Sequence, residues 1–506
     1  MKGLFFVPKL VCLPFDCLNF RIYPTNLKSY DAIIIGSGPN GLAAALTMRK
    51  QGLTTLIIEG DSMIGGGMRT KELTIPGFKH DVCSAVHPFA LESPFFRSNM
   101  VAEAGLEFIS AGYQLAHPLD SGNTAILHKS LDRMYAELGP DAKVYKSLIQ
   151  GLVENWYELS GDILGPLRIP KNPLLMAKFG LNALKSANAT ADRFQTQEGR
   201  ALWAGLVGHG LLPFSKIATS AIGLVLATLG HRSGWLIPKG GSQSIADAML
   251  ADYQNNAGDC KINCWIDNLQ DLPKHKILIV DLTPQQILKL KGLNLTDKYR
   301  KALGDFKYGM GVFKIDWALS DPTPFLDKRC QQAATVHIGN TYEEIAHNEL
   351  MTYKGKIVNK PFVLFSQPSM FDPLRAPEGK HTGWAYCHVP HGSTMDRTEA
   401  IENQIERFAP GFKDTIIAKS SMNTMQMQAY NPNYVGGDIS GGQMDIKQLF
   451  TRPTNSLTPY RTSNPNVYIA SSSTPPGGGV HGMCGFHAAR VAMKDHFNIT
   501  LDFDFV

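Results

Sequence analysis

Residues 30–41 read Tyr30-Asp31-Ala32-Ile33-Ile34-Ile35-Gly36-Ser37-Gly38-Pro39-Asn40-Gly41. This is an apolar strand that runs into a Gly-x-Gly-x-x-Gly turn, and residues 42–50 continue it as a helix. Gly36 lets the chain turn sharply, Gly38 lets backbone N–H groups approach a phosphate, and Gly41 lets the helix pack closely on the strand. The helix N-terminus presents its N–H groups to the anion. We therefore predict a dinucleotide pyrophosphate site at Gly36, Ser37, Gly38, Pro39, Asn40 and Gly41.

A second predicted strand, residues 54–58, ends in Glu59. An acidic side chain at about this distance after the glycine turn accepts hydrogen bonds from the ribose of the adenosine. A glycine turn alone is a weak signal, but here strand, glycines, helix, second strand and acid follow one another in order. We therefore assign Glu59 to the cofactor site.

The next glycine-rich segment, Gly65-Gly66-Gly67-Met68-Arg69, distinguishes between kinds of dinucleotide. Simple nicotinamide dehydrogenases lack it. At this point the sequence resembles FAD enzymes of the amine oxidase and phytoene desaturase type. The resemblance implies that these five residues follow the pyrophosphate and the ribityl chain of FAD. The alternative is a flexible glycine turn that binds nothing.

A third glycine-rich segment lies near the C-terminus, between a predicted strand at residues 466–470 and a predicted helix at residues 488–495. Its glycines permit close approach of the backbone to a ligand, and the helix behind it offers another positive end. Phytoene desaturase-like sequences carry a similar Pro-Gly-Gly-Gly-Val-x-Gly stretch that returns to the flavin. The resemblance implies cofactor contacts from Gly479, Val480, His481 and Met483, while a purely structural glycine loop is the alternative.

The resemblance continues through the middle of the chain. Similar stretches are found at residues 238–249, 281–284, 308–314 and 431–438, so that it extends from about residue 30 to residue 495. The sequence is most similar to the branch named after pyridine nucleotide-disulfide oxidoreductase domain-containing protein 2. That branch is related to the carotenoid desaturases but is not identical to them.

The fold class that follows is α/β, with a Rossmann-like three-layer FAD-binding domain interleaved with a substrate domain of mixed sheet and helices. Length agrees, because 506 residues exceed what one hydrophobic core normally supports. We expect an N-terminal tail at 1–29, a discontinuous FAD-binding domain at 30–90, 235–292 and 458–506, and a substrate domain at 91–234 and 293–457. A substrate pocket is expected between the two domains.

Local patterns predict the main elements of both domains. Residues 141–227 are expected to be largely helical, with residues 221–229 as a buried helix, and residues 306–428 to consist of strands and loops. Individual strands are predicted at residues 261–266, 276–281, 311–317, 362–366 and 382–389. The resemblance implies that the first of these passes near the adenine, and Ile266 is therefore assigned to the cofactor site.

Composition excludes several classes of function. A net charge of +5 is small for this length, and basic residues form no run interleaved with aromatic residues, so no nucleic acid partner is predicted. No apolar stretch has the length needed to span a bilayer. Prolines and charges in residues 1–29 interrupt any secretory signal, so we expect a cytoplasmic protein. Peripheral membrane contact through the apolar residues of this tail is a minority alternative, and the oligomeric state is left open.

The eight cysteines do not predict thiol chemistry or a metal site. Their scatter favours reduced thiols. Cys12 and Cys17 have a spacing that would suit a flavin disulfide reductase, but they precede the fold. Cys260 and Cys264 have no second pair with which to hold zinc. We therefore predict no metal.

The predicted activity is removal of a hydride from an apolar or partly apolar small molecule, with the flavin reoxidised by an external acceptor such as oxygen or a quinone. A single dinucleotide fingerprint gives no support for a bound nicotinamide. His481, His381, Tyr386 and His388 are acid/base candidates, but packing is the favoured explanation for each, so no catalytic residue is assigned. The alternatives are an amine oxidase or isomerase on the same fold, and a regulatory flavoprotein without enzymatic activity.

Overall fold

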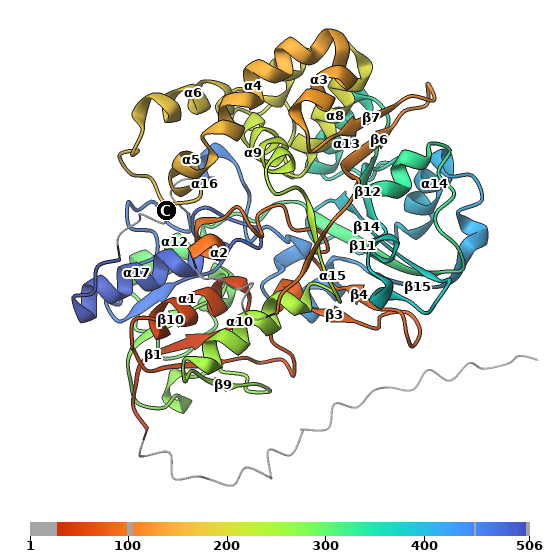
Figure 1. The fold of residues 1–506 in the computed structure, drawn as a ribbon. Helices are drawn as coiled ribbons and strands as arrows, with labels where there is room; N and C mark the ends of the chain where they lie inside the picture. The colour runs from red at the N-terminus through yellow and green to blue at the C-terminus, as the bar shows by residue number, and fades with distance from the viewer. Residues whose placement is uncertain (1–27, 99–104, 450–451, 502–506) are drawn as a thin grey trace, which may run out of the picture.

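A parallel five-stranded sheet forms the base of the molecule (Figure 1). The computed structural model describes residues 28–98, 105–449 and 452–501. The strand order is β16-β10-β1-β2-β9, and each neighbouring pair is parallel. Such a sheet is buried on both faces, which explains its runs of Ile, Leu and Val. The strands are β1 (Tyr30–Ile35), β2 (Thr55–Ile58), β9 (Asp259–Lys261), β10 (His275–Val280) and β16 (Val467–Ile469).

Helices cover both faces of this sheet and complete three layers. On one side α1 (Pro39–Arg49) packs against α10 (Gln243–Asn255) and α17 (Met483–Phe497). On the other side, apolar residues of strands β1, β2, β10 and β16 pack in a separate cluster with residues of α11 (Pro284–Ile287) and α12 (Asp297–Gly304). Because α1 begins with a proline at its first turn, its start is fixed directly after the glycine turn.

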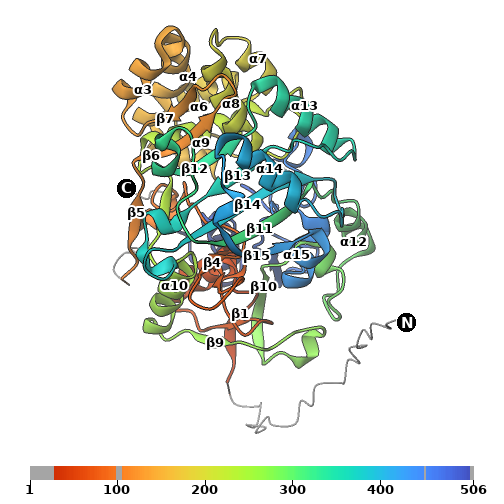
Figure 2. The ribbon, with the colours of Figure 1, turned by 90° about the vertical axis from the view of Figure 1, so that its right-hand side faces the viewer.

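A seven-stranded mixed sheet forms the second half, seen face-on in Figure 2. Its order is β15-β11-β14-β13-β12-β6-β7, and all neighbours are antiparallel except β12 and β6. The strands are β6 (Tyr113–Pro118), β7 (Thr124–Leu127), β11 (Gly311–Leu319), β12 (Ala333–Ile338), β13 (Val363–Ser366), β14 (His381–Val389) and β15 (Ile416–Met422).

Helices cluster at one end of this sheet, at the top of Figure 1, and α14 lies at its side. They are α3 (Leu131–Leu138), α4 (Ala142–Glu154), α5 (Trp156–Ile163), α6 (Pro173–Ala183), α7 (Ala187–Ala191), α8 (Gln197–Gly208), α9 (Ser220–His231), α13 (Tyr342–Tyr353) and α14 (Thr398–Phe408). Shorter elements are β3 (Thr70–Lys71), β4 (His80–Asp81), β5 (Phe108–Ser110), β8 (Leu236–Pro238), α2 (Pro94–Ser98), α15 (Thr424–Tyr430) and α16 (Ile446–Leu449).

The structure confirms the predicted α/β fold class and most local predictions. The strands predicted at 276–281, 311–317, 362–366 and 382–389 are β10, β11, β13 and β14. The helical section 141–227 is present, and its apolar stretch is the buried helix α9. Residues 306–428 contain the predicted strands and loops. They also contain the helices α13 and α14, which the sequence pattern missed.

The strand predicted at residues 261–266 is wrong. β9 ends at Lys261, and Asn263 adopts a positive φ of 52°, which is incompatible with an extended strand. The turn brings the Trp265 ring against Gly60, where a Cβ at Gly60 would lie 2.6 Å from the ring. The chain therefore leaves the sheet edge and folds over the end of β2.

The domain boundaries remain a prediction, and the structure places the strands relative to them. All five strands of the parallel sheet fall within residues 30–90, 235–292 and 458–506. Residues 1–27 of the predicted tail lie outside the described residues. Within the described ranges, no helix combines the length and the apolar character needed to cross a bilayer.

Candidate active site

A cavity of about 590 Å³ lies between the two sheets. One wall consists of the carboxyl ends of the parallel strands, where ligands bind in open α/β sheets. The opposite wall contains Leu364 of β13 and Trp384 and Tyr386 of β14, and helix α9 contributes Ile222 and Leu226. Its volume lies in the range of small-molecule and cofactor sites, roughly 300–1,000 Å³.

The first glycine turn has the geometry that a pyrophosphate requires. Gly36 has a φ of +97°, which favours glycine, and directly follows β1. A Cβ at Gly41 would lie 2.1 Å from the carbonyl oxygen of Gly36, so the helix approaches the strand as closely as it does because no side chain intervenes. A Cβ at Gly66 would likewise lie 3.0 Å from the Cα of Gly38. The two glycine segments therefore form one cradle, which fits an extended dinucleotide.

Glu59 anchors a polar network at the end of β2. Its carboxylate accepts hydrogen bonds from the N–H (2.9 Å) and the hydroxyl (2.5 Å) of Ser37. Arg69 donates to it at 3.2 Å and also pairs with Asp61. The network ties the first and second glycine segments together while Glu59 remains on the cavity wall.

Most residues assigned to the cofactor site from the sequence line this cavity: Gly36, Ser37, Gly38, Pro39, Asn40, Glu59, Gly66, Gly67, Arg69, Ile266, Gly479 and Val480. The others, Gly41, Gly65, Met68, His481 and Met483, do not line it. Gly41 and Gly65 are part of the backbone packing of the cradle, and the side chains of Met68 and Met483 are buried in the apolar core. A cofactor-binding role for each of these residues remains a prediction.

His481 holds the C-terminal glycine loop in shape. It is buried, its Nε2 lies 3.1 Å from the carbonyl oxygen of Gly477, and its Nδ1 accepts the N–H of Met483 at 3.0 Å. Burial lowers its pKa to about 4, so the ring is neutral near pH 7. These contacts favour the structural explanation weighed for this histidine.

The other acid/base candidates occupy different places. Tyr386 lines the cavity, and burial raises its pKa. His388 is buried beside Glu349, with Nδ1 2.8 Å from the carboxylate and Nε2 without a hydrogen-bond partner. His381 lies 3.3 Å from the Ser369 hydroxyl. Of these three residues, Tyr386 alone lines the cavity.

The sequence reasoning missed a row of three neighbouring histidines, of which His117 and His337 are buried and His209 is half-buried. His209 lines the cavity, and its Nε2 lies 3.0 Å from Nε2 of His337. The Nδ1 atoms of His337 and His117 both lack a partner and both face Gly205, at 2.2 and 3.1 Å from where a Cβ would stand. Burial lowers the pKa of His209 to about 3 and that of His117 to about 4. No sequence signal links these rings, because they come from three separate elements.

Asp281 was also missed as a site residue. It follows β10 and is buried against the glycine turn, and its Oδ2 accepts the N–H of Gly41 at 2.9 Å. Burial raises its pKa to about 7, although the N–H groups of Gly41 and Gly38 act in the opposite direction. Asp281 belongs to the family-like stretch 281–284, but the sequence carries no signal for its contact with Gly41, 240 residues earlier.

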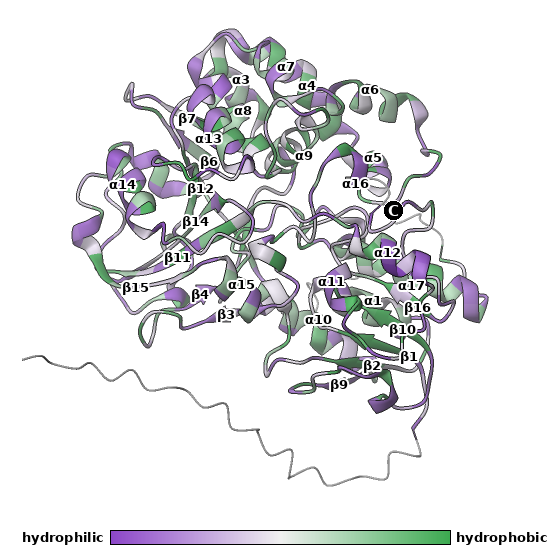
Figure 3. Cartoon of the chain, turned by 180° about the vertical axis from the view of Figure 1, so that it is seen from behind, coloured by the Kyte–Doolittle hydropathy of each residue, from purple (hydrophilic) through white to green (hydrophobic). Residues whose placement is uncertain are grey.

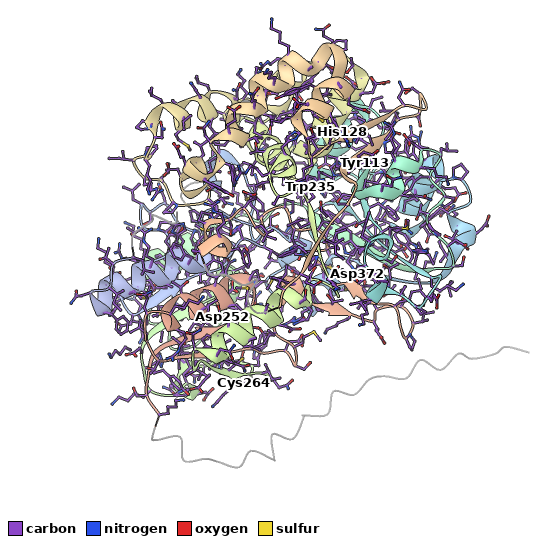
Figure 4. The ribbon with its side chains drawn as sticks, in the orientation of Figure 1. Tyr113, His128, Trp235, Asp252, Cys264 and Asp372 are labelled. Atoms are coloured by element: carbon purple, nitrogen blue, oxygen red, sulfur yellow. The ribbon has the colours of Figure 1, made fainter. Side chains whose placement is uncertain are left out.

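The apolar end of the cavity lies under the helical section. It is lined by Leu211, Ile222, Leu226, Trp235 and Leu364. Figure 4 places Trp235 near the middle of the molecule, below the upper helices. The acidic residues on the cavity wall, Glu59, Asp61, Asp267 and Asp281, all belong to the glycine-turn end. The glycine-turn end therefore suits polar groups that donate hydrogen bonds, and the other end suits apolar groups.

The part of the chain that the structure describes contains neither a cluster of metal-binding side chains nor a disulfide. No group of three or more His, Cys, Asp or Glu side chains there could hold a metal ion. Cys260 and Cys264 are free, and so are Cys83, Cys330, Cys387 and Cys484. Cys12 and Cys17 lie outside the described residues.

Comparisons with known proteins place this fold among flavoenzymes. Residues 34–96 match the NAD(P)-binding Rossmann-like domain. Pyridine nucleotide-disulfide oxidoreductase domain-containing protein 2 of Mus musculus is 23% identical, over 95% of this chain and 95% of its own. A lycopene-forming phytoene desaturase of a Paracoccus species is 24% identical, over 92% of this chain and 97% of its own. The structure of cyclohexylamine oxidase from Brevibacterium oxydans is similar with a TM-score of 0.57 and 15% identity, over 92% of this chain and 99% of its own.

These likenesses extend over nearly whole chains and agree with the sequence resemblance. The relatives include phytoene desaturases, and the structural neighbours share the arrangement of a Rossmann-like sheet and a separate mixed sheet. The chain is homologous to FAD-dependent oxidoreductases, and its dinucleotide-binding segment contains the glycine cradle described above.

Proposed function

We propose that this homologue of the phytoene desaturases, an FAD-dependent oxidoreductase, removes a hydride from an apolar or partly apolar small molecule. The observation that carries the proposal is a continuous cavity that joins the glycine cradle to an apolar chamber. A substrate held in that chamber lies within the same enclosed space as a cofactor held on the cradle.

The residues at the glycine end would hold FAD. The cradle of Gly36, Gly38 and Gly66 leaves room for the pyrophosphate, and Glu59 stands where ribose hydroxyls can donate to it. Gly479 and Val480 present backbone to the same space from the C-terminal loop. When bound, FAD supplies a ring that accepts a hydride or two electrons.

The apolar chamber favours a hydrocarbon-like substrate over an amine. A buried ammonium requires a nearby counter-charge. Among the described residues that line the cavity, the carboxylates belong to the glycine end, whereas Leu226, Trp235 and Leu364 surround the other end. Burial of an apolar substrate there contributes about 0.8 kcal/mol per CH₂. This is the reason to rank desaturation above amine oxidation.

The proton that leaves with the hydride requires an acceptor. His209 and Tyr386 are titratable groups on the wall of the apolar end. His209 is neutral near pH 7 and its Nε2 lies 3.0 Å from Nε2 of His337, but burial lowers its pKa to about 3, which makes this ring a weak proton acceptor. Tyr386 retains its proton near pH 7 because burial raises its pKa, so it cannot accept another.

The test is anaerobic reduction of the FAD-loaded protein, followed by flavin bleaching in a stopped-flow instrument. The donors are phytoene in detergent micelles, which is the substrate in the name of the Paracoccus relative, and cyclohexylamine, named for the structural neighbour. Saturable bleaching by the polyene supports the proposal. Bleaching by the amine alone would move the protein to the amine oxidases, and FAD binding without bleaching by any donor would favour a regulatory flavoprotein.

A variant with a narrower apolar chamber, compared with a matched surface variant, tests where the substrate binds. Leu226→Trp fills the apolar end, whereas Leu326→Trp adds the same side chain at a position that is 74% exposed and away from the cavity. Loss of bleaching in the first variant with unchanged FAD binding would place the substrate in the chamber. Equal activity of both variants would contradict that placement.

A second part of the proposal is peripheral contact with a membrane through the segment around α6. Ile169, Leu174 and Leu181 are 90%, 78% and 73% exposed, and the exposed Lys178 and Lys185 belong to the same segment. Figure 3 shows the mixture of apolar and polar residues on α6. Exposed apolar residues with neighbouring lysines are typical of helices that lie in the headgroup region. An apolar substrate would be available from such a surface.

Vesicle sedimentation tests this contact. The protein should bind vesicles of phosphatidylcholine with phosphatidylserine more strongly than phosphatidylcholine alone, because the lysines favour anionic lipid. Leu174→Asp with Leu181→Asp should abolish the binding, and Leu326→Asp should leave it unchanged. If the double variant sediments like the parent protein, this segment does not contact the lipid.

A further inference from the structure

Asp281 is a buried carboxyl group at the place where the pyrophosphate is to bind. Its Oδ2 lies 2.9 Å from the N–H of Gly41, and a Cβ at Gly38 would lie 2.6 Å from the same oxygen. Its side chain therefore covers the first turn of α1, whose N–H groups are the anion-binding element of this fold. The carboxyl group and the pyrophosphate compete for the same positive end of the helix.

Among the described residues, no cationic side chain acts on the carboxyl group of Asp281. The groups that influence it are the N–H groups of Gly41 and Gly38 on α1, the carboxylate of Glu59 after β2, and the thiol of Cys484 on α17. On the loop from residue 431, Asn433 donates to the backbone carbonyl of Asp281 and not to its carboxylate. Lys289, the lysine among the described residues on the cavity wall, hydrogen-bonds to Gln286.

We propose that Asp281 controls the affinity for FAD by proton linkage, so that FAD binds the form of the protein in which this carboxyl group carries a proton. The proposal rests on the proposed function in so far as FAD is the ligand. A protonated carboxyl group can donate a hydrogen bond to a phosphate oxygen. An ionised carboxylate next to the phosphate repels the phosphate, and the repulsion is strong in a site of low dielectric constant. Binding of FAD at a pH where Asp281 is ionised must therefore take up a proton.

The sign of the pH dependence follows from this linkage. The pKa of Asp281 in the cofactor-free protein is about 7, because burial disfavours its charged form. Below this pH the affinity for FAD should be nearly constant. Above it, affinity should fall by roughly tenfold per pH unit, the slope for one linked proton. Neither His481, with a pKa of about 4, nor Cys484, with a pKa of about 11, changes charge between pH 6 and pH 8.5.

The experiment titrates the cofactor-free full chain with FAD from pH 6 to pH 8.5 and follows flavin fluorescence. In the parent protein the dissociation constant should rise above pH 7. In Asp281→Asn, which cannot ionise, it should be flat and at least tenfold lower than the parent value at pH 8.5. Asp267→Asn is the matched control, since Asp267 lines the same cavity but hydrogen-bonds to Trp265. It should retain the slope of the parent protein.

A second measurement decides the matter if Asp281→Asn does not fold. Calorimetric titration of the parent protein at pH 8, in two buffers with different ionisation enthalpies, should give uptake of up to one proton per FAD. No proton uptake, or a slope that persists in a folded Asp281→Asn, would overturn the proposal. Failure of the parent protein to bind FAD at any pH would instead overturn the proposed function, so the two failures are distinguishable.

Discussion

Glu59 and Gly38 should both be required for FAD retention, for different physical reasons. Glu59→Ala removes a carboxylate that can accept from the ribose hydroxyls, a loss of about 1.5–3 kcal/mol for hydrogen bonds to a charged group. Gly38→Val adds side-chain atoms where the pyrophosphate would lie and also crowds the carboxyl group of Asp281, 2.6 Å from the position of the new Cβ. We therefore expect the valine variant to be the worse of the two. Equilibrium dialysis with FAD measures both.

Asp61→Ala is the control for the first of these variants. Asp61 also pairs with Arg69, so this change tests whether loss of an arginine partner is enough to weaken binding. It should retain FAD nearly as well as the parent protein. If Glu59→Ala and Gly38→Val also retain it, the assignment of residues 36–59 to the cofactor site is incorrect.

The glycine segments keep their positions because the helices that follow them, α1 and α17, are in very close contact. Helices α1 and α17 approach each other at Gly485, where a Cβ would lie 1.8 Å from the carbonyl oxygen of Asn40. Such an approach is possible only without a side chain. The two helices that begin at the first and third glycine segments are thereby fixed relative to one another.

Gly485→Ala should therefore destabilise the protein by several kcal/mol, although alanine is the better helix former. Gly151→Ala is its matched control, because Gly151 lies inside α4 with no atom near its Cβ position. That variant should be stabilised by about 0.5–1 kcal/mol. Urea denaturation of both variants measures the difference. Equal effects would show that the contact between α1 and α17 can relax at little cost.

At the scale of the whole molecule, buried histidines should make the fold sensitive to acid. Burial lowers the pKa values of His80 and His209 to about 3, and of His87, His117, His231 and His481 to about 4. In the unfolded chain the same side chains titrate near 6.5. Between these values the unfolded chain binds more protons, so stability is lost as pH falls from about 6.5 towards 4.

Two buried carboxyl groups oppose this trend without reversing it. The pKa values of Asp281 and Asp316 are raised to about 7 and about 6, so the folded state holds their protons at pH 5. Six histidines outweigh two carboxyl groups, and we expect a lower urea midpoint at pH 5 than at pH 7. Equal midpoints would mean that several of these imidazoles are charged in the folded state.

The molecule as a whole should accept reducing equivalents from its substrate and not from a nicotinamide cofactor. One glycine cradle is present in the described part of the chain, and FAD would fill it. A second dinucleotide would need further phosphate-binding groups, which the apolar end does not offer. NADH and NADPH should therefore bleach the flavin far more slowly than an apolar donor in stopped-flow measurements. Rapid, saturable bleaching by NADPH would contradict the model of a single cofactor.

The sequence by itself determined the nucleotide-binding half, because the signals for it are local. Gly36, Gly38 and Gly41 act within one turn, and their spacing reports the conformation that they permit. Glu59 follows from the length of one strand-helix-strand unit. Where local reading failed, as in the strand predicted at residues 261–266, a single positive φ at Asn263 was the cause.

The long-range contacts of the site and the apolar chamber were decided only by the tertiary structure. Asp281 reaches Gly41 across 240 residues of sequence, and His209 meets His337 across 128. The apolar chamber likewise joins α9 to strands that follow it by more than one hundred residues. Contacts of this kind leave no periodic or spacing signal, because burial and charge at such positions depend on which elements the fold brings together.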